Sequence, residues 1–354
     1  QDNFGSSHFK ERLFFDPWVV AAALMKLLVL LATWHSAIGV EVPGSLHGAI
    51  FFTGFPAGDL VRLDGCGSND GCSRPVVIAK GLASYGGLLP WNRSLLIALK
   101  TRYVVQMDPW CQDSSCPMTP LVDVERALGP GDHGSFDLGG LAWCHHSLFI
   151  VFGGRAGASG VLRCTNCSLG EDCTASCSLV DGGSGPGKGE QQLSGFAAGV
   201  TCVGDHVLIT DNSNFRVQAI PVGCTSAPCD VRTFASGLKW PLGIAAVGDQ
   251  RRVLVTLDAG IASFSRDGTE RRDNFSIRQD SGFLCEGGGR ILVASGGDGN
   301  VVSLDPACEG PNCREVLVWN STGSGERSGG AIAYMPYPPM LNQEAPREEP
   351  VLIM

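Results

Sequence analysis

Cysteine is the residue type in this sequence with the clearest capacity for chemistry, and it occurs fifteen times in 354 residues. Eight of these cysteines form close pairs, and each pair lies between two stretches rich in aliphatic residues. Cysteines at such spacing either oxidise to a disulfide or hold a metal ion, and the redox state of the compartment decides between the two. The pairs are Cys66/Cys72, Cys111/Cys116, Cys224/Cys229 and Cys308/Cys313.

The N-terminal segment indicates an oxidising compartment. From Met25 the sequence MKLLVLLATWHSAIG has a basic start, an apolar stretch, and small residues at Ala37 and Gly39, which together are typical of a secretory signal peptide. We therefore expect residues 1–39 to be a leader, and the rest to be secreted or lumenal in the secretory pathway. In the alternative, residues 18–40 stay uncleaved and anchor the protein in a membrane. Four N-glycosylation sequons, which fit both interpretations, start at Asn92, Asn166, Asn274 and Asn320.

The other seven cysteines fall into two groups. Four of them have C-x2-C and C-x3-C spacings, which suit a zinc knuckle or two disulfides, and a secreted chain favours the disulfides. Three stand alone, so an odd total leaves at least one thiol free or linked to another chain. We expect buried thiols here, although Cys144 and Cys202 could also pair with each other. The first group is Cys164, Cys167, Cys173 and Cys177, and the second is Cys144, Cys202 and Cys285.

A repeat sets the position of the paired cysteines. Segments that start at Gly199, Gly243 and Gly282 share one pattern, and Gly87 and Gly140 start two more copies. Each copy has a glycine, a short apolar stretch, a polar turn, an aliphatic strand, a second turn and an alternating strand. About 40 to 50 residues with four short strands per unit is typical of β-propeller blades. The cysteine pairs fall in the turn between the third and fourth strands of their units.

The two ends of the repeat region predict a closed ring. The first unit begins at its second strand, and the last strand-like piece, SGGAIAYMPY, resembles the missing innermost strand. We therefore predict an all-β fold, a six-bladed β-propeller over residues 40–335 with four antiparallel strands per blade, closed by a C-terminal strand that completes blade 1. Residues 336–354 are rich in proline and acidic residues and are expected to be a disordered tail.

One segment resembles a known family. The sequence LITDNSNFRVQ at residues 208–218 resembles the NHL repeat, through Asp211, Asn214, Arg216 and Val217. The resemblance implies a six-bladed scaffold that binds proteins, glycans or RNA. It also implies kinship in fold with gluconolactonase-like hydrolases, strictosidine-synthase-like proteins and a secreted peptidyl-hydroxyglycine lyase. A net charge of −9 argues against a nucleic-acid partner, because phosphate binding needs a basic surface.

The hydrolase alternative requires a ring of oxygen ligands for a divalent cation in the central channel. One position per blade, at the end of the second strand, would supply that ring, but it holds a single carboxylate. Asp258 or Asp298 could contribute only with a shift in register, and no histidines have zinc-ligand spacing. We therefore expect no catalytic residue, no metal ligand and no cofactor; a metal-dependent lactonase or esterase would need a cation such as Ca²⁺. The six positions are Gly54, Leu99, Phe152, Asp211, Leu257 and Ser295.

A binding surface is the remaining hypothesis. In a propeller, the turns between the second and third strands lie on one face, together with the connections between blades. The cysteine turns and the sequons at Asn92 and Asn166 would lie on the opposite face. We therefore predict a module that binds an extracellular protein or glycan through the first of these faces, with membrane contact only if the leader stays uncleaved. The candidate ligand-binding residues are Lys100, Arg102, Arg155, Asp211, Asn214, Asp258, Asp298 and Asn300.

Overall fold

The computed structural model of the chain describes much of the region from residue 46 to residue 338. Within that region it leaves out residues 47, 56–57, 67–71, 73–74, 83–86, 131–132, 135, 155–158, 183–188, 190–191, 249–250, 259, 276–280, 296–298, 309–312, 314 and 321–326. The predicted leader and the tail from residue 339 onward lie outside the described residues. In the described part of the chain, no helix is long and apolar enough to cross a membrane.

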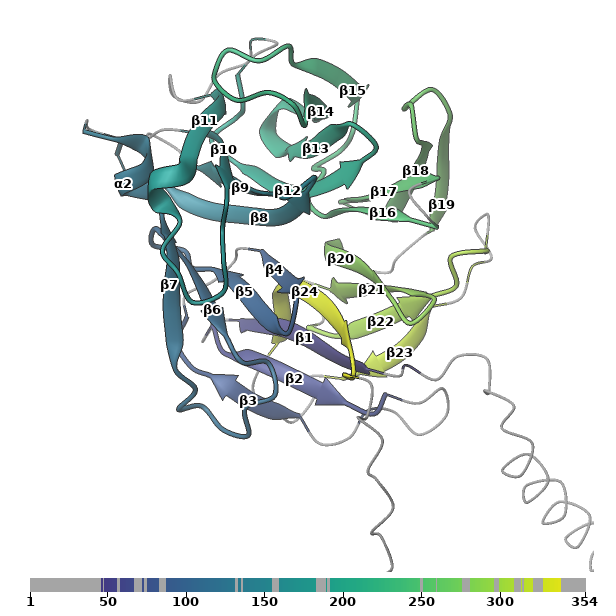
Figure 1. The fold of residues 1–354 in the computed structure, drawn as a ribbon. Helices are drawn as coiled ribbons and strands as arrows, with labels where there is room; N and C mark the ends of the chain where they lie inside the picture. The colour runs from purple at the N-terminus through teal and green to yellow at the C-terminus, as the bar shows by residue number, and fades with distance from the viewer. Residues whose placement is uncertain are drawn as a thin grey trace, which may run out of the picture. The chain divides into compact units, whose positions relative to one another are not determined.

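Six four-stranded antiparallel sheets form a ring, which confirms the predicted propeller (Figure 1). We name the strands of each blade A to D, from the centre outward. Blade 1 consists of β24 (Arg327–Pro336), β1 (Gly48–Phe55), β2 (Leu60–Asp64) and β3 (Val76–Ala79). Blade 2 consists of β4 (Leu88–Trp91), β5 (Ser94–Ala98), β6 (Tyr103–Met107) and β7 (Met118–Asp123). Blade 3 consists of β8 (Asp137–Cys144), β9 (Ser147–Gly153), β10 (Gly160–Thr165) and β11 (Cys177–Gly182).

The second half of the ring repeats this order. Blade 4 consists of β12 (Ala197–Val203), β13 (His206–Asp211), β14 (Arg216–Pro221) and β15 (Arg232–Ser236). Blade 5 consists of β16 (Ile244–Val247), β17 (Arg252–Leu257), β18 (Gly260–Ser265) and β19 (Arg271–Phe275). Blade 6 consists of β20 (Ser281–Gly287), β21 (Arg290–Ser295), β22 (Val301–Leu304) and β23 (Val316–Trp319).

The strand at the C-terminal end of the propeller closes the ring as predicted. β24 pairs antiparallel with β1, with Ala333 opposite Phe51 and Ile332 opposite Phe52. It also lies beside β20 of blade 6 and β4 of blade 2, so it joins the first and last blades at the centre. The strand ends at Pro336, one residue beyond the expected boundary of the propeller.

The repeat glycines are the points where the A strands touch. A Cβ atom on Gly140 would lie 2.8 Å from the backbone nitrogen of Val200 in the next blade. A Cβ on Gly87 would lie 2.5 Å from the nitrogen of Leu141, again in the next blade. Any larger residue at these positions would push two blades apart. Glycine therefore recurs once per blade because the blades touch there, not because a turn requires it.

Two threonines also join neighbouring blades near the centre. The hydroxyl of Thr210 accepts from the backbone N–H of Gly199 and donates to the carbonyl of Leu242 in the next blade, both at 2.7 Å. Thr256 repeats the arrangement one blade further on, with Gly243 and the carbonyl of Gly282, again at 2.7 Å. Each hydroxyl therefore connects the innermost segment of its own blade to the innermost segment of the next.

The hydrophobic core is divided among the blade interfaces. Six clusters of buried residues each combine side chains from two adjacent blades, and together they cover all six interfaces of the ring. Phe149 of blade 3, for example, packs in one cluster with Ile209 of blade 4. Burial of this kind is the main stabilising term, so each blade depends on both of its neighbours.

A pair of polar positions recurs on strands B and C of the blades. The first is at the start of strand B, and the second lies diagonally across on strand C. One member is long and the other short, and the two form hydrogen bonds in four blades. The hydrogen-bonded pairs are Ser94 with Gln106 at 3.0 Å, Ser147 with Arg163 at 3.1 Å, Arg252 with Ser263 at 2.8 Å, and Arg290 with Ser303 at 3.3 Å.

In several blades an arginine on strand B or strand C also reaches the C–D turn of the next blade. Arg62 donates to the carbonyls of Pro109 and Cys111 at 2.9 and 2.7 Å. Arg163 donates to the carbonyl of Cys224 at 2.8 Å. The turns that carry the cysteine pairs are therefore held by the preceding blade as well as by their own disulfides.

Disulfides close the C–D turns, as the sequence predicts. The four hairpin bridges are Cys66–Cys72, Cys111–Cys116, Cys224–Cys229 and Cys308–Cys313. Blade 5, which has no cysteine pair, has a plain turn stabilised by Asp267, whose carboxylate accepts from Ser265 and Thr269.

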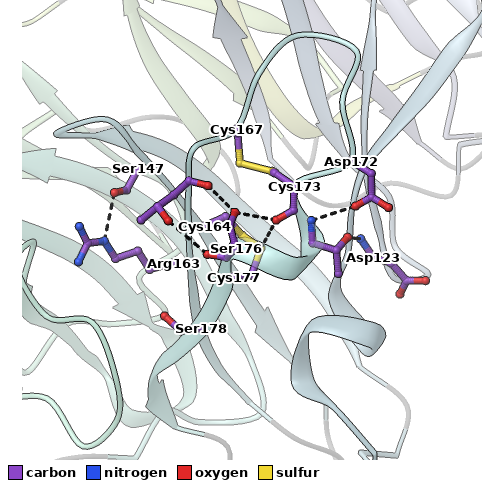
Figure 2. The surroundings of a disulfide bond; sticks show 12 residues. Asp123, Ser147, Arg163, Cys164, Cys167, Asp172, Cys173, Ser176, Cys177 and Ser178 are labelled. Carbon is purple, nitrogen blue, oxygen red and sulfur yellow. Dashed lines mark hydrogen bonds between the residues drawn. A yellow bond between two sulfur atoms is a disulfide. The ribbon is translucent and has the colours of Figure 1, made fainter.

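The four cysteines of blade 3 form two disulfides rather than a zinc knuckle. Cys164 is bonded to Cys177, and Cys167 to Cys173 (Figure 2). The short turn η1 (Thr174–Ser176) between them binds the neighbouring blade, because the backbone N–H of Asp123 donates to the Thr174 hydroxyl at 2.9 Å. Asp123 also caps α2 (Val124–Leu128), a five-residue helix that the strand pattern of the sequence does not predict.

Of the remaining three cysteines, two pair across blades. Cys144 on β8 is bonded to Cys202 on β12, which covalently links blades 3 and 4. Cys285 on β20 is free, and burial raises the pKa of its thiol to about 12. At neutral pH it therefore stays protonated and is a poor nucleophile.

Candidate functional site

The face predicted to bind a partner carries the B–C turns and the connections between blades, and we call it the B–C face. Lys100 lies there with its Nζ 3.9 Å from the carboxylate of Asp137. Arg102 donates to Glu125 and to the Tyr103 hydroxyl. Asp258 forms an ion pair with Lys239, with 2.5 Å between Oδ2 and Nζ. These side chains form separate local pairs on blades 2, 3 and 5 rather than one convergent site.

Asp211 has a structural role in this fold. Its side chain is fully buried, and its two oxygens accept from the backbone N–H of Ser194 at 2.8 Å, from Asn214 at 2.8 Å and from Arg216 Nε at 2.9 Å. Arg216 in turn donates to the carbonyl of Gln192 at 2.6 Å. The residues that resemble the NHL repeat thus fasten the connection from blade 3 to the B–C turn of blade 4.

The other predicted site residues give less information. Arg155 and Asp298 lie outside the described residues. Asn300 follows the B–C turn of blade 6, where its carbonyl accepts from the backbone N–H of Ser295 at 2.8 Å. Of the sequons, Asn92 and Asn166 are exposed on the face of the cysteine turns, and Asn320 is exposed just after β23. The backbone of Asn274 lies in β19, but its side chain lies outside the described part.

Three exposed aromatic side chains on the B–C face of blade 4 were not predicted. Phe196 is 49% exposed, Phe215 is 44% exposed and Trp240 is 50% exposed. We call these three residues the aromatic patch. Phe196 precedes β12, Phe215 ends the B–C turn, and Trp240 lies in the connection to blade 5. The rings of Phe215 and Trp240 are in edge-to-face contact, with 5.7 Å between their centres.

The backbone beneath the aromatic patch is tightly constrained. The N–H of Asn212 donates to the carbonyl of Phe196 at 3.2 Å, and the N–H of Leu238 donates to the carbonyl of Phe215 at 2.8 Å. The side chain of Asn212 donates to the carbonyl of Pro241 at 3.0 Å. One turn therefore positions both segments that flank it, and the patch is attached to a rigid support.

Two members of the patch have backbone conformations that bulky residues rarely adopt. Phe215 has a φ of 57° and Trp240 a φ of 51°, both in the left-handed region. Glycine or asparagine usually occupies such positions, because a side chain there is strained. Strained backbone tends to persist at functional sites, where the surrounding structure holds it in place. Both residues combine this strain with an apolar ring facing solvent.

A buried carboxylate lies near the support of the patch. Asp181 is the last residue but one of β11, and its Oδ2 has no hydrogen-bond partner among the described residues. Burial raises its pKa to about 6, and the negative charge of Asp211 adds to the shift, while the N–H of Gly182 and the charge of Arg216 oppose it. Among the described residues, no group of three or more His, Cys, Asp or Glu side chains is arranged to hold a metal ion.

Comparison with known proteins gives the class of the fold. No family model matches the chain, and no curated protein matches it in sequence. A chain in the solved structure of a nidogen/laminin complex is similar, with a TM-score of 0.59 and 11% identity, over 81% of this chain and 97% of that chain. A gluconolactonase from Xanthomonas campestris has a TM-score of 0.46 and 18% identity, over 66% of this chain and 75% of that one. The protein is a six-bladed β-propeller with seven disulfides.

Proposed function

We propose that this propeller is an extracellular module that binds a protein partner through the aromatic patch of blade 4. The observation that carries the proposal is the exposure of Phe196, Phe215 and Trp240 on one turn system, with two of them in left-handed backbone. Folding gains little from apolar rings that remain half exposed. Such rings are the side chains that dominate the energetics of protein interfaces.

Rigidity of the patch supports the same proposal. Binding costs free energy whenever loops or side chains must be ordered, so a preorganised surface keeps more of its contact energy. The backbone hydrogen bonds of Asn212 and Leu238, together with the buried Asp211–Arg216 ion pair, fix this turn before any partner arrives. The exposed Lys239 beside Trp240 adds a polar rim to the apolar centre.

The proposed compartment follows from the cysteines. Seven disulfides indicate an oxidising environment, either outside the cell or in the secretory pathway. The similar solved chain comes from a structure described as a nidogen/laminin complex, which is an assembly between proteins. That similarity concerns the fold.

Capture from conditioned medium tests the proposal. The wild-type chain and a Trp240→Ala variant are immobilised and exposed to medium from cells that secrete the protein. Any captured protein is then identified, purified and titrated against both chains. We expect one identified partner whose dissociation constant rises at least tenfold for Trp240→Ala, because interface hot spots contribute about 2 kcal/mol or more.

A matched control separates the aromatic patch from general surface hydrophobicity. Leu317 on the outer strand of blade 6 is 51% exposed, so Leu317→Ala removes an exposed apolar side chain from another part of the ring. This variant should bind like the wild type. Equal affinity of Trp240→Ala and wild type for the purified partner would contradict the proposal. Aromatic-dependent binding to an array of extracellular glycans, with none to proteins, would contradict the protein partner.

A further inference from the structure

A cavity lies on the other face of the ring, at blade 2. It has a volume of about 550 Å³ and opens between the A–B turn and the disulfide-closed C–D turn of that blade. Met107 and Ser94 are buried lining residues, and Trp110 contributes a half-exposed ring. The remaining lining residues are Arg93, Gln106, Asp108, Pro117, Thr119 and Pro338.

The ring of Trp110 is a fixed wall of this cavity. Its backbone N–H donates to the carboxylate of Asp108 at 2.9 Å, and its ring lies edge-on to Phe51 with 6.2 Å between ring centres. The guanidinium of Arg62 stands 5.8 Å from the ring centre, and that arginine donates to the carbonyls of Pro109 and Cys111. The indole is therefore held by blade 1 as well as by its own disulfide turn.

The chain itself leads into this cavity after β24. The ring of Tyr337 packs against Trp110, with 5.5 Å between ring centres, and its hydroxyl accepts from the backbone N–H of Gly65 at 2.9 Å. The next residue, Pro338, lines the cavity. Two contacts of Tyr337, with the Trp110 ring and with the backbone of Gly65, thus fix the path of the chain just before the described residues end.

We propose that the cavity of blade 2 is the docking site of this chain's own segment 339–354. Pro338 lines the cavity and is followed by Pro339 in the sequence, and a residue before proline favours extended backbone, so the described chain reaches the cavity in an extended form. Proline-rich extended segments bind grooves lined by aromatic rings, with little ordering cost. Met340 and Leu341 follow at once and match the apolar walls formed by Met107 and Trp110.

Proximity favours this occupant over an unrelated one. The cavity wall carries one charge of each sign, Arg93 and Asp108, and the segment contains Glu344, Glu348 and Glu349 against a single arginine, so Arg93 is the wall residue that would pair with it. A segment tethered at the cavity wall has an effective concentration in the millimolar range, which an untethered peptide rarely reaches. Docking by the chain itself therefore needs only modest intrinsic affinity.

Peptide binding to a shortened chain tests the inference. A fluorescein-labelled synthetic peptide with the sequence of residues 339–354 is titrated into the full chain and into a chain that ends at Pro338, and fluorescence anisotropy is measured. We expect the shortened chain to bind the peptide at least tenfold more tightly, because the full chain already occupies its own site. A scrambled peptide should bind neither. Equal binding of the native peptide to both chains, or binding to neither, overturns the inference.

Two variants test whether the peptide binds in this cavity. One changes an exposed residue of the cavity wall, and the other changes a residue on the opposite face. Thr119→Arg, at an exposed lining position, should weaken peptide binding to the shortened chain at least tenfold by filling the cavity. Trp240→Ala on the opposite face should leave peptide binding unchanged. Sedimentation of the full chain shows whether the segment docks on its own chain or on a second copy. A monomer at all concentrations fits docking within one chain. A dimer that grows with concentration and disappears on removal of residues 339–354 would overturn it in favour of exchange between copies.

Discussion

The guanidinium of Arg163 in blade 3 donates to the carbonyl oxygen of Cys224 in blade 4, across 2.8 Å. The same arginine also donates to Ser147 on its own sheet. One side chain therefore links two strands of blade 3 and holds the disulfide turn of blade 4. Arg62 does the same between blades 1 and 2. Arg252 does so between blades 5 and 6, where it donates to the carbonyl of Pro306 at 3.3 Å. Contacts of this kind make the ring cooperative beyond its apolar interfaces.

Replacing Arg163 with methionine should lower the free energy of unfolding by about 1 to 3 kcal/mol, because a charged donor is lost to partly buried acceptors. Urea denaturation followed by circular dichroism, without reductant, measures the change. Arg126→Met is the control: Arg126 forms an exposed ion pair with Asp172, and such pairs contribute about 1 kcal/mol at most. An equal loss in both variants would show that the contact between blades adds nothing.

The long–short pairs predict a rescue by exchange. In blade 5, Arg252 stands on strand B and Ser263 on strand C, whereas blade 3 has the reverse order with Ser147 and Arg163. Arg252→Ser and Ser263→Arg should each destabilise the protein, and the double variant should recover part of the loss. A double-mutant cycle in urea should give a coupling free energy of about 0.5 to 3 kcal/mol. If the destabilisation of the double variant equals the sum of the two single variants, the two positions are not exchangeable and the prediction is wrong.

The disulfide between blades 3 and 4 should stabilise the protein more than a disulfide within one hairpin. Cys144 and Cys202 are 58 positions apart and Cys224 and Cys229 only 5, so the chain-entropy model assigns about 4 kcal/mol to the first disulfide and about 2 kcal/mol to the second. Thermal unfolding of the two double-alanine variants should therefore show the larger fall in Tm for Cys144→Ala/Cys202→Ala. The opposite ranking would indicate that local fraying of the hairpin dominates.

Asp181 should make stability depend on pH. Its folded pKa is raised from 3.8 to about 6, mainly by burial, so between these values the folded state binds more protons than the unfolded state. The stability contributed by the protonated carboxyl is present below about pH 4 and is lost as the pH rises through about 6. Asp181→Asn should remove this loss and gain at most about 3 kcal/mol at pH 7, measured by urea denaturation from pH 4 to pH 8. A wild type and variant with parallel pH profiles would rule out the buried charge as the cause.

Replacing Phe215 should weaken partner binding and leave the free energy of unfolding nearly unchanged. Because its φ is 57°, glycine at this position relieves backbone strain, while glycine also raises the entropy of the unfolded chain. The two effects oppose each other, so Phe215→Gly should change the free energy of unfolding by less than about 1 kcal/mol. The same variant should weaken binding to an identified partner at least tenfold. A large loss of stability would mean that the ring serves the fold instead.

The architecture was predictable because its signals are local and repeated. The glycines at residues 87, 140, 199 and 243 recur since each has to let an A strand touch the next blade, and the cysteine pairs lie close together in the sequence. The bridge between Cys144 and Cys202 could be suggested only as a possibility, because its partners are brought together by the ring as a whole.

The candidate site was harder to predict because its residues acquire roles only through distant contacts. Asp211 looked available for a ligand, but its partner Ser194 comes from a connection whose path no local pattern reveals. Phe215 and Trp240 are 25 positions apart, and they meet where the backbone N–H of Leu238 donates to the carbonyl of Phe215. The available signal was the presence of large aromatic residues at turn positions that glycine or asparagine usually fills.

Pairing of β1 with β24 has a consequence for biosynthesis. Blades 2 to 6 are each encoded in one continuous stretch and can assemble as the nascent chain lengthens, whereas β1 keeps an open edge until the ribosome has delivered residue 336. A product truncated before residue 327 would expose that edge to other strands, and an open edge of this kind is a template for aggregation. Solubility of the product would thus depend on whether translation had reached β24.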